Sequence, residues 1–320
     1  MKTAIIIAAL TCNAPPNAPT EDANEVIQKL ATARTTTTGG KKFTSFKVGD
    51  IHLPAWTWLT VDKPVKIPFR TPIIGPQTYV RNAPGFYSTE RLPYALETQR
   101  APGNKKNYNG NFNQHLHNFS VDCRNLSGGI KWGAAQFSEL RNLSIHNVAA
   151  GRYALRVDTG STGWAAQLEI KAHDLFTGFR SGNGVLVNQA RSGRLTASVN
   201  AAKTALWLRQ SYNIKATLRL EQCDHVILEA SKGCNLAIDW DKPSSTPLIV
   251  RSGRGANTIT ITFRRAPKTL WYTIDGGQPQ KIPHLTGMHQ KDGETIQLTT
   301  HWSGKPRKLH VEWRNLHSKP

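Results

Sequence analysis

The chain is poor in acidic residues: among its 320 residues, 21 are Asp or Glu and 41 are Lys or Arg, and the formal net charge is +20. This balance indicates an anionic partner, such as nucleic acid, an acidic polysaccharide, a membrane surface or an acidic subunit. Nucleic-acid binding predicts basic residues concentrated on one element, with aromatic residues between them. Here they are spread along the whole chain and form only pairs, such as Lys41-Lys42 and Arg264-Arg265. We therefore favour a solvated basic surface over nucleic-acid readout.

Cysteine is also scarce, with four residues at positions 12, 123, 223 and 234. None of them forms a Cys-x-x-Cys pair, so the usual sequence signal of a zinc site is missing. Cys223 and Cys234 are close enough in the sequence to pair, but buried free thiols are the simpler expectation. The sequence predicts no metal site and no organic cofactor.

Long apolar runs are missing as well, so we predict no transmembrane segment. The one short run, Ile5–Leu10, follows Lys2 and precedes Cys12, an arrangement that resembles a weak signal peptide. We interpret residues 1–20 instead as a strand that docks on a partner, followed by a Pro/Asn-rich linker. A functional signal peptide would instead indicate a secreted protein.

The centre of the chain carries a repeat in place of a helical period. Its units alternate apolar and polar residues, which is typical of a strand with one buried face. These units are Asn118–Asp122, Asn142–His146, Gln167–Lys171, Thr196–Asn200 and Thr217–Glu221. Their spacing averages about 24 residues, a period that indicates a solenoid whose units must stack to bury their apolar faces.

A second apolar register follows each unit about a dozen residues later, which gives each repeat more than one strand. We assign it to Ile130/Trp132, Leu155/Val157, Phe176/Phe179, Leu206/Leu208 and Ile227/Leu228. The Leu-x-x-Leu-x-Leu-x-x-Asn signature of leucine-rich repeats is missing. We therefore predict an all-β chain with a parallel β-helix over residues 21–251; a β-sandwich with coincidental spacing is the alternative.

The two ends of the predicted β-helix differ from its repeat. Glu21–Ala33 has a helical pattern with Thr20 as the expected N-cap, so we predict a short capping helix. After Arg251 the alternating segments 258–263, 270–274, 295–299 and 308–313 predict a small antiparallel β-sandwich over residues 252–320. Such a domain would cover the open end of the solenoid.

Several short motifs resemble the pectate-lyase-like superfamily. They are Asp22-x-x-x-Val26-Ile-Gln, Leu53-Pro54, Pro64-Val-Lys-Ile-Pro68, Ile73-x-Gly75, Gly129-Ile-x-Trp132 and Leu140-Arg-Asn-Leu-Ser-Ile145. The resemblance covers Glu21 to about Arg251 and departs from the family at Ala55-Trp56, where a Gly is usual. It implies a right-handed parallel β-helix, as in many phage tailspikes and some glycoside hydrolases, and a homotrimer. Fold resemblance alone implies little about chemistry.

Stacking the units places polar side chains in outward ladders. Asp122 and Glu169 lie two coils apart, roughly 10 Å at the usual strand spacing, near the upper end for an inverting glycosidase pair. His146 lies between them, so these three are our candidate catalytic residues. The candidate ligand-binding residues are Lys171, Arg219 and Glu221 of the same ladders, and Tyr87 and Tyr94 of a predicted long polar loop, Asn82–Gly110. Surface ion pairing explains the ladder charges equally well.

Two functions follow from these observations. The first is a virion structural protein, tailspike-like or capsid-associated, that binds a host-surface glycan or neighbouring virion subunits without catalysis. The alternative is a secreted polysaccharide lyase or glycoside hydrolase acting on an acidic polysaccharide. The chain lacks an acidic cluster for calcium and the Asn-Thr-Asp and Gly-His-Gly motifs of related hydrolases, so we favour the first, with the virion as its location; the alternative function would place the protein outside the cell. Nucleic-acid binding rests on charge alone.

Overall fold

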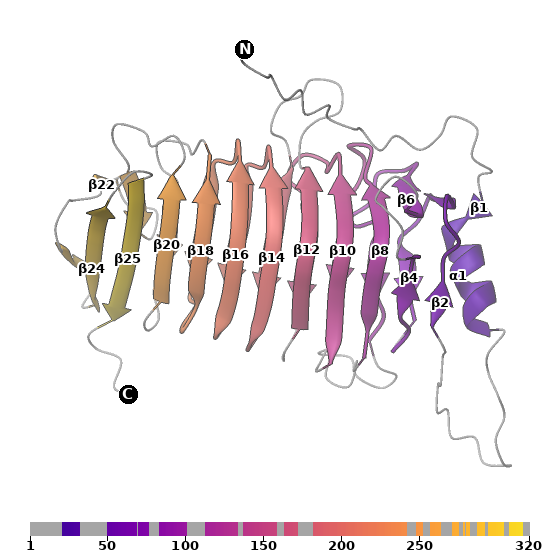
Figure 1. Ribbon diagram of the computed structural model, residues 1–320, viewed down its shortest axis with the longest axis horizontal. Helices are drawn as coiled ribbons and strands as arrows, with labels where there is room; N and C mark the ends of the chain where they lie inside the picture. Colours follow the sequence, from indigo (N-terminus) through magenta and orange to yellow (C-terminus); the bar gives the residue numbers. More distant parts are fainter. Residues whose placement is uncertain are drawn as a thin grey trace, which may run out of the picture.

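The structure is a computed structural model, and its described residues form a parallel β-solenoid of about seven turns with almost no helix. The described residues are 21–32, 50–68, 70–76, 83–100, 113–133, 137–158, 163–171, 182–241, 248–251, 257–263, 271–274, 278, 280–281, 287–291, 294–303 and 307–315. Figure 1 shows successive strands side by side along the long axis of the molecule. The prediction of an all-β parallel β-helix is confirmed.

Each central coil contributes one strand to each of two sheets. The parallel strands of the first sheet are, in spatial order, β1 (Glu21–Asp22), β3 (Trp58–Val61), β6 (Gly85–Ser88), β8 (His115–Asp122), β10 (Ser138–His146), β12 (Gly163–Lys171), β14 (Gly193–Asn200), β16 (Ile214–Glu221), β18 (Asn235–Trp240) and β20 (Asn257–Phe263). Beside this path, β2 (Ile51–His52) pairs with β5 (Ile73–Ile74), and β5 pairs with β8.

The second sheet is also parallel over most of its width. Its parallel strands are β4 (Val65–Ile67), β7 (Leu96–Thr98), β9 (Ile130–Trp132), β11 (Tyr153–Asp158), β13 (Asn183–Asn188), β15 (Thr204–Arg209), β17 (His225–Glu229), β19 (Leu248–Arg251) and β21 (Trp271–Ile274). The register confirms most of the second predicted apolar row, because Leu155 faces Ile130 and Leu206 faces Val185. Two assignments are wrong. The coil after β11 uses Val185 and Val187, whereas the predicted Phe176 and Phe179 lie outside the described residues. In β17 the row contains Val226 in place of Ile227, which pairs with Trp207.

The core lies between the two sheets and is built from the alternating apolar residues of the repeat. Phe119, Leu143 and Leu218 are each at most 2% exposed. They stand in one row of the first sheet, because Leu143 pairs with Phe119 and the row continues from coil to coil through Leu168 and Ala197. Neighbouring coils therefore bury each other's apolar residues, as expected for a solenoid.

The predicted loop Asn82–Gly110 is wrong over its described part. Residues 83–100 contain β6, which pairs with β3 and β8, and β7, which pairs with β4 and β9. Phe86 and Leu96 are fully buried there. The alternating apolar pattern does not identify this coil, because its apolar residues alternate poorly and are interrupted by Pro93 and by charged residues.

The described residues contain one helix, α1 (Ala23–Thr32), which lies beside the first strands (Figure 1). Asp22, not Thr20, is its N-cap, since the Asp22 Oδ1 atom accepts a hydrogen bond of 2.9 Å from the Glu25 backbone N–H. Ala23 and Ile27 are fully buried, which fixes the inner face of the helix. No helix in the described parts of the chain is both long and apolar enough to cross a membrane.

Antiparallel strands follow the last parallel strand of each sheet. In the first sheet these strands are β25 (Arg307–Asn315), β24 (Glu294–Ser303) and β23 (Gly287–Lys291), and in the second sheet the strand is β22 (Gln280–Lys281). β25 pairs with β20, so the strand edge of the solenoid is covered at this end. The predicted sandwich over 252–320 stays a prediction, because much of that segment lies outside the described residues.

Candidate functional site

Two polar ladders cross the outer face of the first sheet in the predicted register. Ser144 pairs with Ser120 and Glu169, and His146 pairs with Asp122 and Lys171. Further along, Ser198 pairs with Glu169 and Arg219, and Asn200 pairs with Lys171 and Glu221. The register of the ladder residues is therefore as predicted, but the residues at the two ends of the ladders differ in their exposure to solvent.

Asp122 is engaged in structural contacts. It is only 6% exposed, and its Oδ1 atom accepts hydrogen bonds from the Arg124 backbone N–H at 3.0 Å and from Asn147 Nδ2 at 2.8 Å. These contacts hold the turn after β8 to the turn after β10. A general acid or base needs an oxygen that can reach substrate, and the buried position of Asp122 argues for a turn-stabilising role.

The other two candidate catalytic residues lie on the next two strands. His146 on β10 is beside Asp122 in register and is 8% exposed. Glu169 and Lys171 are on β12, one coil further, and their backbone register is all that the structure describes of them. The proposed separation of the Asp122 and Glu169 carboxylates therefore stays a prediction.

Arg219 and Glu221 lie on the exposed side of the same ladders. Arg219 Nη2 is 3.1 Å from Glu221 Oε1, and the two residues are on one strand with one residue between them. With side chains 56% and 34% exposed, this is a solvated ion pair. The two residues are accessible to a ligand, although they satisfy each other.

The two candidate tyrosines are separated. Tyr87 on β6 pairs in register with Asp122 and is 9% exposed, with the Arg124 guanidinium 5.8 Å from its ring centre. Tyr94 lies before β7, and burial is the main cause that raises its pKa, while the nearby Arg156 opposes this shift. Since Arg156 belongs to β11 of the second sheet, the structure does not bring Tyr94 to the ladders.

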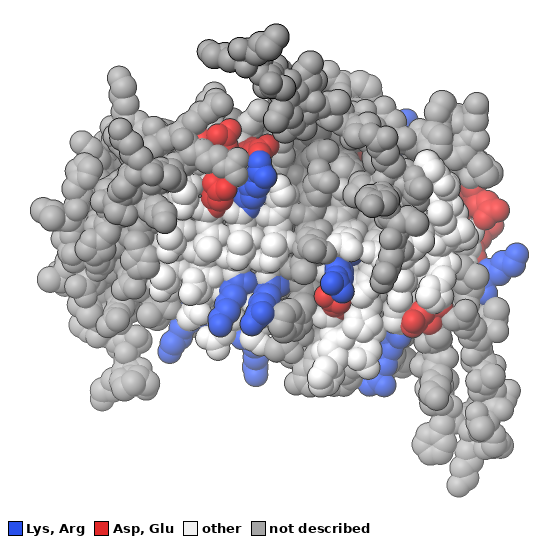
Figure 2. All heavy atoms as spheres, in the orientation of Figure 1, with Lys and Arg blue, Asp and Glu red and all other residues white. Residues whose placement is uncertain are grey.

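A basic patch occupies the first-sheet corner where β14 and β16 begin. Arg194 pairs in register with Lys215, and both are exposed. Tyr212 lies just before β16 and forms an isolated parallel bridge with Lys232, which lies just before β18. The Tyr212 side chain is 39% exposed. Figure 2 shows several Lys and Arg side chains along the lower left part of this face, whereas one group of acidic residues lies near its upper edge. We define the basic patch as Arg194, Tyr212, Lys215 and Lys232.

The two coils that carry Arg194, Tyr212 and Lys215 contain no acidic residue before Glu221. Between Asp174 and Glu221 there is no Asp or Glu, while Lys and Arg occur seven times, at 180, 191, 194, 203, 209, 215 and 219. The sequence signal of the basic patch is therefore a local absence of acidic residues and not a cluster of basic ones, and the prediction of an evenly spread basic surface did not include it.

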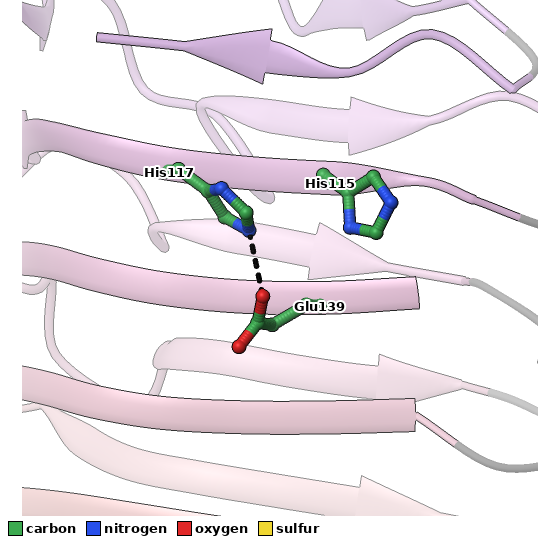
Figure 3. Close-up of side chains that lie close together, drawn as sticks. All are labelled: His115, His117 and Glu139. Carbon is green, nitrogen blue, oxygen red and sulfur yellow. Dashed lines mark ion pairs between the residues drawn. The ribbon is translucent and has the colours of Figure 1, made fainter. Parts of the chain in front are cut away.

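A second grouping lies on the same sheet face, two coils away. His115 and His117 are on β8, and Glu139 on β10 pairs in register with His115. Glu139 Oε2 is 3.2 Å from His117 Nε2, and the imidazole ring centres are 5.4 Å apart. Figure 3 shows both rings on one face of the strand, with Glu139 reaching toward His117. The sequence contains two signals for this grouping that the prediction did not use. They are the alternation of polar and apolar residues in His115-Leu-His117 and the presence of Glu139 one coil later.

Comparison with models of known protein families finds no match to this chain, and comparison with curated proteins finds no similar sequence. The site is therefore interpreted from its own geometry alone.

Proposed function

We propose that this protein is a non-catalytic virion protein, tailspike-like or capsid-associated, that binds an anionic host-surface glycan through the basic patch. A secreted polysaccharide lyase or glycoside hydrolase is the alternative. The main observation behind the proposal is that two exposed cations, Arg194 and Lys215, pair in register on consecutive coils of the first sheet. Strands in register lie about 4.8 Å apart, so one anionic polymer that lies across both strands can contact the two cations together.

Cations on the second sheet are arranged differently. Lys66 and Lys131 both contact Glu97, at 2.5 and 2.6 Å. Further along that sheet, Arg156 Nε is 2.7 Å from Asp158, and Arg209 Nε is 3.3 Å from Glu229. These opposite charges lie on neighbouring strands or, for Arg156 and Asp158, on one strand. At the basic patch, in contrast, two exposed cations face each other in register.

The exposed ring of Tyr212 supports a sugar polymer as the partner. Carbohydrate rings present apolar C–H faces, and an amphipathic aromatic side chain offers a matching surface beside the cations. The repeat of the solenoid adds a second argument, because equally spaced coils present equally spaced contacts to a polymer. Nucleic acid shares the negative charge, so it is an outcome that the experiment must separate.

The catalytic alternative draws less support from the described residues. Asp122 is buried and accepts hydrogen bonds from its own turn and from Asn147 on the next coil, and the Arg219–Glu221 pair is solvated. A glycosidase needs two carboxylates that flank one bond of the substrate. The proposal of binding without catalysis is consistent with these contacts.

The finer structural assignments are part of the proposal. We propose a right-handed, pectate-lyase-like coil, with α1 as its N-terminal cap and a small C-terminal sandwich at the other end. A homotrimer would present three basic patches to one surface, and multivalent contact would raise the avidity for a polymeric glycan.

The test is binding of the full-length protein to immobilised heparin and polygalacturonate, used as sulfated and carboxylated probes, at about 0.15 M salt. Arg194→Gln/Lys215→Gln is expected to weaken binding at least tenfold. The matched control is Lys66→Gln/Arg209→Gln, which removes the same charge from the second sheet and is expected to bind nearly as well as the wild type.

Three results would count against the proposal. Equal weakening in both double variants would show that net charge alone drives binding. Tighter binding to single-stranded DNA than to either glycan would favour a nucleic-acid partner. Release of reducing or unsaturated sugars, abolished by Asp122→Asn or Glu169→Gln, would favour the secreted enzyme.

A further inference from the structure

The His115, His117 and Glu139 grouping lies apart from the basic patch and has the composition of a metal site. Two imidazoles and one carboxylate are the protein ligands of many zinc sites that keep an open coordination position. The potential ligand atoms of all three residues lie within 4.8 Å of one another. We propose that His115, His117 and Glu139 bind one divalent transition-metal ion, with zinc the best match, on the outer face of the first sheet.

The β-sheet explains why these three side chains converge. Residues two apart on a strand point to the same face, so His115 and His117 both project outward while Leu116 between them is buried. Glu139 stands directly across from His115 on the neighbouring strand and reaches diagonally to His117. The ligands thus come from two adjacent, hydrogen-bonded strands, which are a rigid support for a metal ion.

The hydrogen bonding of the imidazoles points to a missing ligand. Within the described part of the chain, the buried Nδ1 atom of His115 has no hydrogen-bond partner. His117 Nε2 is also buried and, although it lies near Glu139, it does not form a well-aligned hydrogen bond with the described residues. A buried polar atom without a partner is costly. A metal ion would satisfy both nitrogens and the carboxylate together, whereas a His117–Glu139 contact alone leaves His115 unexplained.

The required movement is small. Zinc bonds to His nitrogen and carboxylate oxygen are about 2.0–2.2 Å long, so ligand atoms around one ion are at most about 4 Å apart. Closing from 4.8 Å requires only side-chain rotation. The side chains of His117 and Glu139 are 19% and 32% exposed, so the position has access to solvent for entry of the ion and for a water ligand.

A nearby positive charge opposes a bound metal ion. Arg141 pairs in register with His117 on the neighbouring strand, and its charge disfavours a bound cation.

The experiment is titration of the full-length protein with Co²⁺, which takes the same ligands as zinc and absorbs visible light. One equivalent of Co²⁺ with ligand-field bands is expected, and Zn²⁺ should displace it. His115→Gln, His117→Gln and Glu139→Gln should each weaken this binding at least about tenfold. His225→Gln, on β17 of the second sheet, is the matched control and should retain it.

Two further measurements keep the result interpretable. Far-ultraviolet circular dichroism and the urea midpoint must show that each variant retains the β-solenoid, so that lost binding is not lost folding. Arg141→Gln should bind Co²⁺ severalfold more tightly, a change that a simple His117–Glu139 ion pair would not produce. Absence of stoichiometric Co²⁺ binding in the wild type, or equal binding in all variants, would overturn the proposal. Both outcomes are measured without a glycan, so failure of the metal proposal is distinguishable from failure of the proposed glycan binding.

Discussion

Asn142 Nδ2 donates a hydrogen bond of 2.9 Å to Asn118 Oδ1 on the preceding coil. Asn118 in turn donates from its Nδ2 atom to the carbonyl oxygen of Gly75 at 3.1 Å. Both asparagines have a positive φ, which is 60° for Asn118 and 51° for Asn142. Asparagine tolerates this conformation better than most residues. These contacts stack the bends within β8 and β10, so each asparagine supports both the backbone conformation and the register.

Replacement of Asn118 separates these two contributions. Asn118→Ala should destabilise the protein by about 2 kcal/mol, because alanine is strained at positive φ and both hydrogen bonds are lost. Asn118→Gly loses the same hydrogen bonds but tolerates the conformation, so about half of that loss is expected. Urea unfolding of the two variants checks this, and an equal loss in both would contradict a conformational role for Asn118.

Two glycines test how closely the coils approach one another. A Cβ atom at Gly129 would lie 2.3 Å from the carbonyl oxygen of Ala154 and 2.6 Å from Ile145 Cγ2. Gly129→Ala should therefore cost at least about 2 kcal/mol, since the neighbouring backbone must move. Gly151 has φ of +71° but nothing within 4 Å of the added atom, so Gly151→Ala should cost only about 1 kcal/mol. Thermal unfolding of both variants measures the difference, and a larger loss for Gly151→Ala would refute the assigned packing.

The regular coils were predictable from sequence because their apolar residues alternate without interruption. The stretch from Asn118 to Asp122 and its four successors fixed the register of the outer ladders, which the strand pairing reproduces. The coil at 83–100 was not predictable in this way, since its strands are short. A β-bulge after Ala165, where β12 has one residue more than β14, also hides the period.

The candidate site was predicted less well than the fold. Sequence position placed Asp122 and His146 correctly beside each other, but it did not reveal that Asp122 accepts hydrogen bonds from its own turn and from Asn147 on the next coil. Burial on an outward-facing strand depends on how the chain packs over that strand, which a local pattern does not contain. The grouping of His117 with Glu139 likewise depends on the coil length between β8 and β10.

The buried cysteines should be unreactive in the folded protein. Cys123, Cys223 and Cys234 are free and buried, as predicted, and burial is the main cause that raises the pKa of Cys234 to about 11. Since the thiolate is the reactive form, these three thiols should resist alkylation by iodoacetamide at pH 8 and react only after denaturation. Mass spectrometry of labelled peptides checks this, and rapid native labelling of Cys234 would contradict its burial.

The stability of the solenoid should depend on pH through Glu97 on β7. Burial alone would raise the pKa of this carboxyl group, but hydrogen bonds from Lys131 and Lys66 together outweigh burial and lower the pKa. A carboxyl group with a lowered pKa in the folded state stabilises the protein above its unfolded pKa of about 4.3, and this contribution is lost as the pH falls through the folded value.

Glu97→Gln should therefore be less stable than the wild type at pH 7, and the two proteins should converge as the pH falls from about 5 to about 3. Lys66→Met and Lys131→Met each remove one of the two ammonium groups while keeping most of the apolar stem, so each should retain part of this pH dependence. The measurement is the urea midpoint at a series of pH values. Parallel curves for the wild type and Glu97→Gln from pH 3 to 7 would show that the two lysines do not stabilise the folded carboxylate, because a shifted pKa must make the difference in stability change with pH.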